Sequence, residues 1–272
     1  MILLNEIREG KFAMPTKLSK VNQSVEKVIQ IIEVMAHERQ PMRLQDIALK
    51  CEMPPSTALR MINTLLVYGY VNQDQTSLRY ALSLKFAQIG SRVCEQVSLR
   101  DMVHPLLVEL SQRCQESSCL AIEEDMEVVY TDVVDGPDSM LKIMQRIGKR
   151  APMHSTGIGK LLLLNYNSRQ INEFIATKGL QVLTPNTLVT REALVAKLAE
   201  IRQQGYALDD EECELGARCV AAPVRDYTGK IVAGVSVSGP ISRMSMERIA
   251  AIAPVVMETA AKMSQLMAYE EE

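Results

Sequence analysis

The stretch from Arg43 to Gly69, RLQDIALKCEMPPSTALRMINTLLVYG, is typical of two short helices joined by a tight corner. Because a residue that precedes proline is pushed out of the helical region, we expect Met53 and Pro54 to be non-helical. Pro55 suits the first position of a new helix, where the N–H that proline lacks is not needed. The apolar stripe of the first helix, at helical spacing, comprises Leu44, Ile47, Ala48 and Cys51.

The second helix has two chemically different faces. Its polar side chains share an arc of about 120° and include no acid. Hydroxyl, amide and guanidinium groups donate to phosphates and to base edges in the major groove of DNA. An ordinary amphipathic surface helix would show the same division into faces. The arc contains Ser56, Thr57, Arg60, Asn63 and Thr64, and the apolar side contains Ala58, Leu59, Met61, Ile62, Leu65 and Leu66.

The segments that flank these helices decide between the two interpretations. After Gly69, residues 70–71 and 78–82 favour two short strands, and residues 72–77 (NQDQTS) form a polar turn between them. Arg79, on the second strand, is a further candidate for DNA contact. Residues 24–38 predict a supporting helix capped by Ser24. The sequence therefore predicts a winged helix-turn-helix whose second helix enters the DNA groove. The apolar stripe expected on the supporting helix comprises Val25, Val28, Ile29, Ile32 and Met35 or Ala36.

Length and composition indicate an ordinary globular chain. Its 272 residues favour two domains, and 47% hydrophobic against 23% charged residues predicts a full apolar core. No apolar run approaches the ~18 residues of a membrane span, and the first residues lack the pattern of an export signal. Six cysteines without C-x-x-C spacing favour reduced thiols. We therefore expect a cytoplasmic protein that does not bind membranes.

The net charge of −3 hides a difference between the two halves of the chain. Residues 1–98 hold 12 Lys and Arg against 9 Asp and Glu, and residues 99–272 hold 18 against 24. The mildly basic half is the one with the candidate DNA-binding helix. We therefore expect few phosphate contacts per copy, with useful affinity coming from two copies on one site.

The remaining sequence divides into a tail, a connector and a second domain. We expect a flexible tail at 1–20, a DNA-binding domain at 21–82, a linker and dimerisation helix at 83–98 that begins after Ser83, and a second domain at 99–272. Strands of the second domain are expected at 118–123, 128–134, 140–145, 220–225 and 231–238, and helices at 103–115, 157–164, 168–177, 191–204 and 246–268. Without a regular strand–helix alternation, this order favours an α+β domain with helices packed on a sheet.

Three segments of the second domain are small, polar and contain glycine: 148–160 (GKRAPMHSTGIGK), 205–219 (GYALDDEECELGARC) and 234–240 (GVSVSGP). Gly157-Ile158-Gly159 at a helix start presents backbone N–H groups that suit a carboxylate. Ser236 and Ser238 alternate with valines, so their hydroxyls point to one face of a strand. These features favour a pocket for a small oxygen-rich molecule.

Other kinds of site fit this sequence less well. Gly159-Lys160 is followed by leucine, so the pattern of a phosphate-binding loop is missing. His154, Cys213, Cys219 and the acids at 209–212 have weak spacing for a metal. An enzyme of the serine hydrolase type would need a G-x-S-x-G motif, which is absent. We therefore expect no cofactor, no metal and no catalytic residue.

Three motifs together resemble an IclR-family transcriptional regulator. They are PPSTALRMINTL (54–65), APMHSTGIGK (151–160), and the pattern G-x3-D-x2-E-x6-C-[LIVM]-[GSA], which is met by Gly205, Asp209, Glu212, Cys219, Val220 and Ala221. The chain carries Arg225 where the family prefers an aromatic residue or histidine before Asp226. The resemblance implies a winged helix-turn-helix, a linker helix that dimerises, and a C-terminal GAF/PAS-like α/β domain that binds an effector. It also implies a dimer or a dimer of dimers.

The resemblance further implies a pocket for a small carboxylate effector. In it, Asp209 accepts a hydrogen bond from a ligand hydroxyl or water, and Cys219 packs rather than reacts. The implied lining residues are Met140, Ile143, Ala151, Gly157, Ile158, Asp209, Ala217, Cys219, Ser236 and Ser238.

We expect a DNA-binding regulator of metabolic genes, more often a repressor than an activator, whose operator affinity responds to a small organic acid. A second interpretation remains open, namely a small-molecule-binding protein or enzyme in which the helix-turn-helix serves only oligomerisation. Salt-dependent affinity for DNA distinguishes the two.

Overall fold

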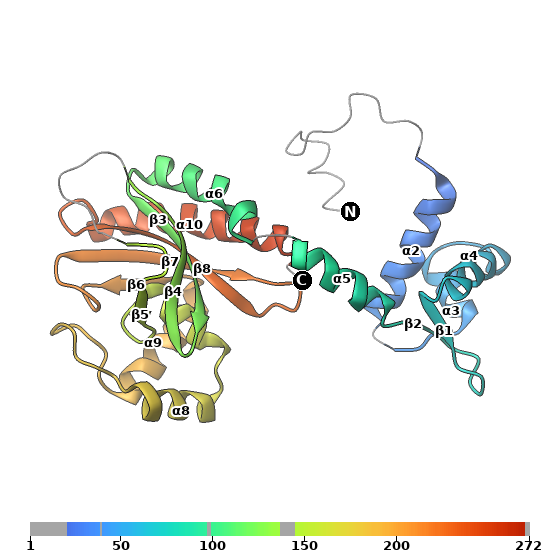
Figure 1. Cartoon of the computed structure of the whole chain (residues 1–272), viewed down its shortest axis with the longest axis horizontal. Helices are drawn as coiled ribbons and strands as arrows, with labels where there is room; N and C mark the ends of the chain where they lie inside the picture. The colour runs from blue at the N-terminus through green and yellow to red at the C-terminus, as the bar shows by residue number, and fades with distance from the viewer. Residues whose placement is uncertain (1–20, 39, 97–98, 137–144, 270–272) are drawn as a thin grey trace. The chain divides into compact units, whose positions relative to one another are not determined.

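The computed structural model describes residues 21–38, 40–96, 99–136 and 145–269 (Figure 1). The chain divides into two compact units, residues 1–96 and 97–272. Within the described ranges, no helix has the length and apolar character that crossing a membrane requires.

The first unit is a small helical domain with a two-stranded sheet. Its core is formed by one side of each of the first three helices and by both strands, through buried residues such as Ile31, Ile47, Ile62, Val71 and Tyr80. The mixed helix and hairpin order confirms the expected winged helix-turn-helix. The elements are α2 (Gln23–His37), α3 (Leu44–Lys50), α4 (Pro55–Val67), β1 (Val71–Gln73), β2 (Tyr80–Leu82) and α5 (Lys85–Gln96).

The corner between α3 and α4 follows the proline pattern. Glu52 adopts a left-handed backbone conformation with φ of 49°, which reverses the chain. The Met53 N–H donates to the Ala48 carbonyl at 3.0 Å, which closes the end of α3. Pro54 is extended, and Pro55 is the first residue of α4. The left-handed Glu52 therefore follows the end of α3, and Pro55 marks the start of α4.

The supporting helix α2 differs from the expectation in its cap and in its buried side. Asn22, not Ser24, is the N-cap, because its Oδ1 accepts from the backbone N–H of Ser24 at 3.0 Å. Ile31 and Met35 are the buried residues of the helix. Val25 and Ile29 were expected in the core but are 55% and 50% exposed. The helix carries more apolar residues than one stripe needs, so packing against α3 and α4 selects the side that is buried.

The wing strands differ from the expectation in their bounds: β1 extends further, to Gln73, and β2 begins later, at Tyr80. β1 and β2 pair antiparallel, with Val71 opposite Leu82. The Asp74 carboxylate accepts from the backbone N–H and the hydroxyl of Ser77, which holds the turn. Leu78 has φ of 54°, so the extended conformation does not resume until Tyr80.

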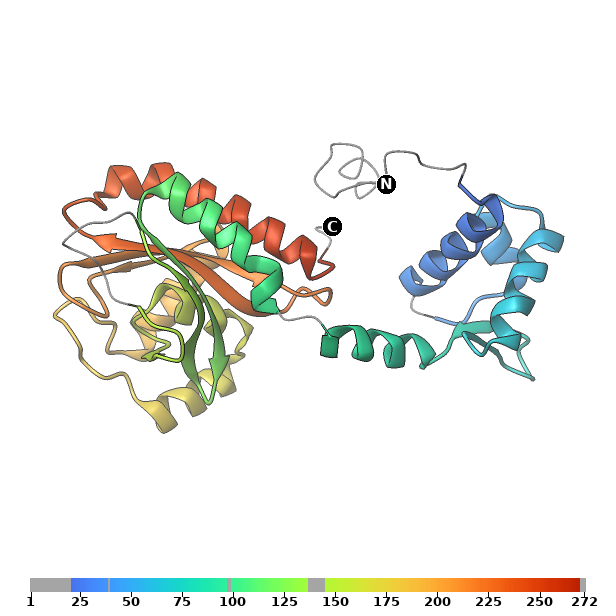
Figure 2. The ribbon, with the colours of Figure 1, turned by 45° about the horizontal axis from the view of Figure 1, so that its top comes forward.

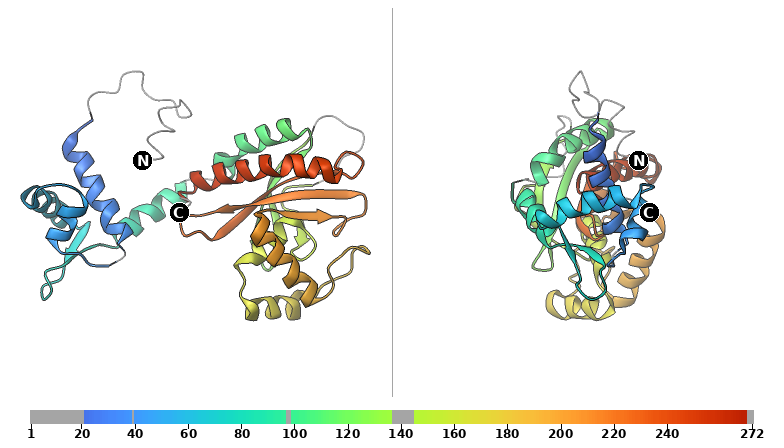
Figure 3. Two further views of the ribbon diagram at one scale, coloured as in Figure 1. Left: turned by 180° about the vertical axis from the view of Figure 1, so that it is seen from behind. Right: turned by 90° about the vertical axis from the view of Figure 1, so that its right-hand side faces the viewer.

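The second unit is a six-stranded antiparallel sheet in the order β5-β4-β3-β8-β7-β6, with helices on both faces. Helices α6 and α10 lie side by side on one face (Figure 2), and Figure 3 shows α10 along the strands from behind. The α+β architecture is thus confirmed. The strands are β3 (Ser117–Glu124), β4 (Glu127–Val134), β5 (Arg150–Pro152), β6 (Ala207–Asp210), β7 (Ala217–Arg225) and β8 (Ile231–Pro240). The helices are α6 (Leu99–Cys114), α7 (Gly157–Leu162), the 3-10 turn η1 (Leu163–Asn165), α8 (Ser168–Lys178), α9 (Arg191–Gln204) and α10 (Met246–Leu266).

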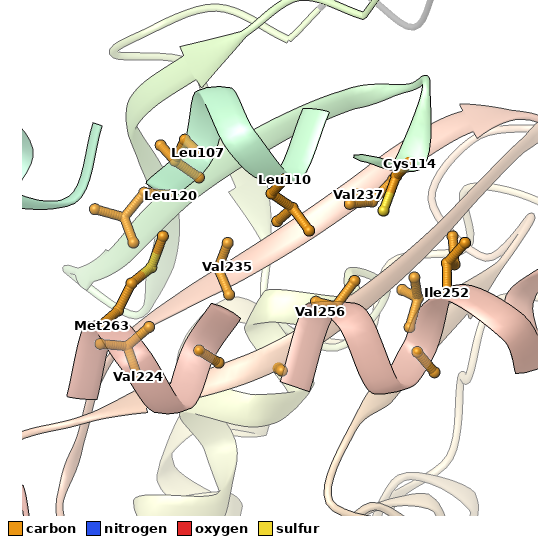
Figure 4. Packing of buried hydrophobic residues seen from close by; sticks show 14 of the residues in the cluster. Leu107, Leu110, Cys114, Leu120, Val224, Val235, Val237, Ile252, Val256 and Met263 are labelled. Carbon is orange, nitrogen blue, oxygen red and sulfur yellow. The ribbon is translucent and has the colours of Figure 1, made fainter. Parts of the chain in front are cut away.

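Side chains alternate between the two faces of the central strands. On β7 and β8, residues such as Val224, Val235 and Val237 join the core formed with α6 and α10 (Figure 4). The residues between them point to the opposite face, where α7 packs against β3, β4, β6, β7 and β8. Ser236 and Ser238 therefore share the face covered by α7, as their spacing predicts.

Several elements of the second unit differ from the expectation. The short edge strands β5 and β6 were not predicted. Helix α6 begins at Leu99 rather than at 103, so Pro105 lies inside the helix rather than in its first turn. The predicted strand at 140–145 falls almost entirely on residues 137–144, outside the described residues, and so do Met140 and Ile143.

Candidate DNA-binding helix and effector pocket

Helix α4 turns its polar face to solvent within the first unit. The opposite face of the helix is buried and consists of Ala58, Met61, Ile62 and Leu65. The residues exposed on the other side include Ser56, Arg60, Asn63 and Thr64, while Thr57 is half-buried at the edge. Leu59 was expected on the apolar side but is 37% exposed, because it lies at the boundary between the faces.

The exposed face of α4 keeps its hydrogen-bonding groups available. Within the described part of the chain, the side chains of Arg60 and Asn63 have no hydrogen-bond or ion-pair partner. The Thr64 hydroxyl donates to the Arg60 carbonyl at 3.2 Å, which leaves its lone pairs outward. The side chains of Arg60 and Asn63 form no bonds within their own unit, among the described residues, and both can therefore bind an external partner.

Arg79 on the wing is in a different situation. Its Nη1 donates to the Pro41 carbonyl at 3.1 Å, which ties the wing to the chain before α3. The side chain is half-buried rather than extended into solvent. A guanidinium has five N–H donors, so Arg79 keeps donors for a phosphate while its position is fixed.

In the second unit, sulfur and hydroxyl groups line up across the face of the sheet that α7 covers. Cys119 on β3 lies opposite Ser236 on β8, with 3.0 Å between Sγ and Oγ. Cys219 on β7 lies opposite Ser238, and Asp209 on β6 lies opposite Cys219. Five polar groups from four strands therefore share one buried surface.

Two further residues enter this surface that the sequence did not single out. The Gln145 side-chain amide donates to the Ser238 hydroxyl at 3.3 Å and lies 3.5 Å from the Tyr130 hydroxyl. The Gln145 Oε1 atom is buried and has no hydrogen-bond partner within the described residues. Because Tyr130 and Gln145 come from segments without glycine or motif character, only the fold reveals their position.

Helix α7 approaches this surface through its glycines. A Cβ added to Gly157 would lie 3.1 Å from the Ala221 Cβ and 3.6 Å from the Cys219 Sγ. The Thr156 hydroxyl caps the helix by accepting from the Gly159 N–H at 3.2 Å. The N–H groups of Gly157 and Ile158 have no acceptor in the described part of the chain. Two backbone donors thus remain at the end of α7 that faces Cys219.

A buried charged cluster supports this site. The ammonium of Lys160, a fully buried side chain, pairs with the Glu212 carboxylate and donates to the Leu208 carbonyl at 2.6 Å. The Asp209 carboxylate accepts from the backbone N–H of Glu212 at 2.9 Å. Burial raises the pKa of Asp209 to about 7, an effect that the nearby Lys160 opposes. The sequence around Lys160, a lysine followed by four leucines, does not predict that this side chain is buried.

Burial acts on the thiols at the site in the same direction. Burial, with the neighbouring Asp209 carboxylate, raises the pKa of both Cys213 and Cys219 to about 11. The thiolate is the nucleophilic form, so these groups stay protonated at neutral pH. Burial lowers the pKa of His154, whose Nε2 lies 3.0 Å from the Gln181 carbonyl oxygen.

The other expected effector residues lie at the margins. Ala151 is on the edge strand β5, and Ala217 is the first residue of β7. Ser236, Ser238 and Asp209 are at most 7% exposed. Neither of two cavities in this unit is lined by any expected effector residue. Among the described residues, the two serines and Asp209 are thus buried and lie outside both cavities.

Both units of the chain are similar to domains of known proteins. The model of the IclR helix-turn-helix domain matches residues 24–75, and the model of the bacterial transcriptional regulator IclR C-terminal domain matches residues 91–265. The HTH-type transcriptional regulator XynR of Escherichia coli (strain K12) is 32% identical over 91% of this chain and 98% of its own length. The HTH-type transcriptional regulator KdgR of the same strain is 33% identical over 91% and 94%.

Solved structures give the same result. The crystal structure of the Thermotoga maritima IclR is 31% identical and aligns with a TM-score of 0.60 over 91% of this chain and 99% of that chain. The C-terminal domain of E. coli KdgR is 33% identical, with a TM-score of 0.57 over 63% of this chain and 99% of that one. These relatives are transcriptional regulators rather than enzymes, and the family binds operator DNA and effector ligands. The chain belongs to the IclR family of transcriptional regulators.

Proposed function

We propose that this regulator is a cytoplasmic repressor that binds its operator through the exposed face of α4 and responds to a small carboxylate bound beside α7. The observation that carries the proposal is that Arg60 and Asn63 are exposed and have no partner in the described part of the chain. Arginine pairs bidentately with guanine, and asparagine with adenine, so these two groups supply direct base recognition.

The proposed operator complex contains at least two copies of the chain. Several cations of the first unit are already engaged, since Lys50 pairs with Glu38 at 2.7 Å and Lys85 donates to the Tyr68 carbonyl at 2.7 Å. Few charges per copy therefore remain for phosphates, and a homodimer, or a dimer of dimers, doubles the contacts on one DNA site. Two recognition helices would enter successive major grooves about 34 Å apart.

Repression is the proposed direction of control. Among the similar proteins, the transcriptional repressor IclR of E. coli (strain K12) is 31% identical over 88% of this chain, and the repressor AllR of that strain is 29% identical over 89%. Both relatives are named as repressors, which supports repression as the function of this chain.

The proposed effector is a small carboxylate. The free N–H groups of Gly157 and Ile158 and the hydroxyls of Ser236 and Ser238 are donors suited to its oxygens. Asp209 is suited to accept from a hydroxyl on the ligand. The buried sulfur and alanine side chains around these groups would limit the ligand to a small molecule.

Control by this effector follows from the closed packing of the site. A ligand shifts a protein between two arrangements only as far as it binds one better than the other. Because the serines are buried, binding requires an arrangement in which they are accessible, and that arrangement is the one the ligand favours. A coupling of about 1–3 kcal/mol would change operator affinity about 5- to 150-fold.

A single titration tests the proposal. Fluorescence anisotropy with labelled DNA from upstream of the chain's own gene should show saturable binding that weakens as salt rises. Addition of small keto, hydroxy and sugar acids, found by thermal-shift screening of the full chain, should change that affinity. Salt-independent or absent binding would support the alternative in which the helix-turn-helix serves only oligomerisation.

A further inference from the structure

A cavity of about 240 Å³ lies at the opposite end of α7 from Gly157. Its walls come from α7, η1, α9, β7 and β8, and the residues at their junction include Leu161, Leu164, Ile201 and Ile231. None of the residues of the proposed effector pocket lines it. The cavity is therefore a separate site within the same unit.

Two arginines give this cavity its charge. Arg202 on α9 and Arg225 on β7 both line it, and no acid is among the lining residues. Within the described part of the chain, neither guanidinium forms an ion pair. Two cations that line one cavity without an acid among its other lining residues favour an anion in that cavity.

Each guanidinium also keeps most of its donors. The Arg202 Nη2 donates to the Leu164 carbonyl at 3.2 Å, and the Arg225 Nη1 donates to the Gly229 carbonyl at 2.8 Å. These single bonds fix the positions of the two side chains and leave further N–H groups of the five on each. The side-chain amide of Asn165 donates to the Ile231 carbonyl at 2.8 Å and accepts from the Ile231 N–H at 3.2 Å, so the backbone fixes its position. Most of the unused hydrogen-bond donors of the cavity therefore belong to the two guanidinium groups.

We propose that this cavity binds a small organic anion, with a carboxylate held by Arg202 and Arg225 and a short alkyl body against Leu161, Leu164 and Ile231. Planar guanidinium groups match the geometry of a carboxylate. The cavity volume of about 240 Å³ is below the ~300–1,000 Å³ of pockets for drug-sized ligands, which favours a short-chain acid. Burial of its alkyl body against the apolar walls adds affinity that a simple inorganic anion cannot gain.

Equilibrium dialysis of the full chain with isotopically labelled butyrate tests this site. The wild-type chain should bind butyrate saturably at millimolar concentration. Arg202→Gln and Arg225→Gln should each weaken binding about tenfold or more, the scale of a lost charge-assisted hydrogen bond. Arg169→Gln, which removes an exposed arginine of α8 away from the cavity, should leave binding unchanged. Circular dichroism checks the fold of each variant, and Arg202 is exposed, so its substitution should be tolerated.

The same assay separates this site from the proposed effector pocket. In the Ser238→Ala background, Arg202→Gln should still weaken butyrate binding about tenfold or more. Loss of binding in Ser238→Ala, with both arginine variants unaffected, would place the anion beside α7 and overturn the proposal. The absence of saturable binding for butyrate, isobutyrate and valerate would overturn it as well. Equal affinity for inorganic phosphate would contradict the role of the apolar walls.

Discussion

Lys160 and Glu212 form an ion pair inside the second unit, where the lysine side chain is fully buried and the glutamate is 6% exposed. The ammonium also donates to the Leu208 carbonyl, whereas the Glu212 Oε2 atom has no partner among the described residues. The pair joins α7, whose first residues face the proposed effector pocket, to the loop after β6 that positions Asp209. It therefore holds together the elements from which that pocket is built.

Removal of one partner should be strongly destabilising. Lys160→Met leaves a buried carboxylate without its cation, and we expect the free energy of unfolding to fall by about 3–5 kcal/mol in urea denaturation. Lys262→Met is the control, because its pair with Glu258 lies at the surface and contributes about 0–1 kcal/mol. The double variant Lys160→Met/Glu212→Leu should lose less than the sum of the two single variants, since no charge remains unpaired. Additive losses would show that the two side chains act independently.

Asp209 should make stability depend on pH. Burial raises its pKa from 3.8 to about 7, so the folded chain binds this proton more tightly than the unfolded chain does. The associated stability is complete below about pH 4 and is lost as pH rises through 7. Burial also raises the pKa of Glu212, which has the same sign. Asp209→Asn should flatten the decline in denaturation midpoint between pH 4 and pH 7, and an unchanged decline would mean that Asp209 titrates normally.

Gly159 should tolerate no side chain, whereas Gly90 should. A Cβ on Gly159 would overlap the backbone of Met153 and the Thr156 hydroxyl, and backbone cannot move aside cheaply. Gly159→Ala should therefore lower stability by about 1–3 kcal/mol or more. A Cβ on Gly90 in α5 meets nothing within 4 Å, and alanine there should raise stability by about 0.5–1 kcal/mol. Thermal melts of both variants compare the two directly, and equal effects would contradict the packing described for α7.

Ser238 should act in effector response and not in DNA binding. Ser238→Ala removes a hydroxyl that faces α7, so we expect unchanged operator affinity and a reduced shift on addition of the effector acid. Ser118→Ala is the control, because this buried serine donates to the Leu107 carbonyl at 2.8 Å on the other face of the sheet. Anisotropy titrations with and without the acid give both quantities. A loss of DNA binding in Ser238→Ala would identify a structural role.

The sequence predicts the parts of the fold that depend on local signals. Pro54 and Pro55 set the corner because proline restricts its neighbour and itself, whatever the rest of the chain does. Valine and serine alternate in β8, which places the hydroxyls of Ser236 and Ser238 on one face of the sheet. Both features survive in the structure because no competing local preference opposes them.

Features decided by packing could not be predicted in this way. β6 was missed because its inward-facing Asp209 hides the strand pattern, and its burial depends on the distant Lys160. Asn22 and Ser24 are both good cap residues, and only the position of the first helical turn decides between them. Ile31 was left out of the buried stripe of α2 because that helix has apolar residues on more than one side.

The central claim is that the exposed face of α4 reads DNA, and Arg60 tests it most directly. Anisotropy titration of Arg60→Ala against the upstream DNA, over a series of salt concentrations, should show a loss of about 1–3 kcal/mol in binding free energy. Arg169→Ala, an exposed arginine of the second unit, should bind as the wild type does. Equal affinity of wild type and Arg60→Ala at every salt concentration would contradict the claim.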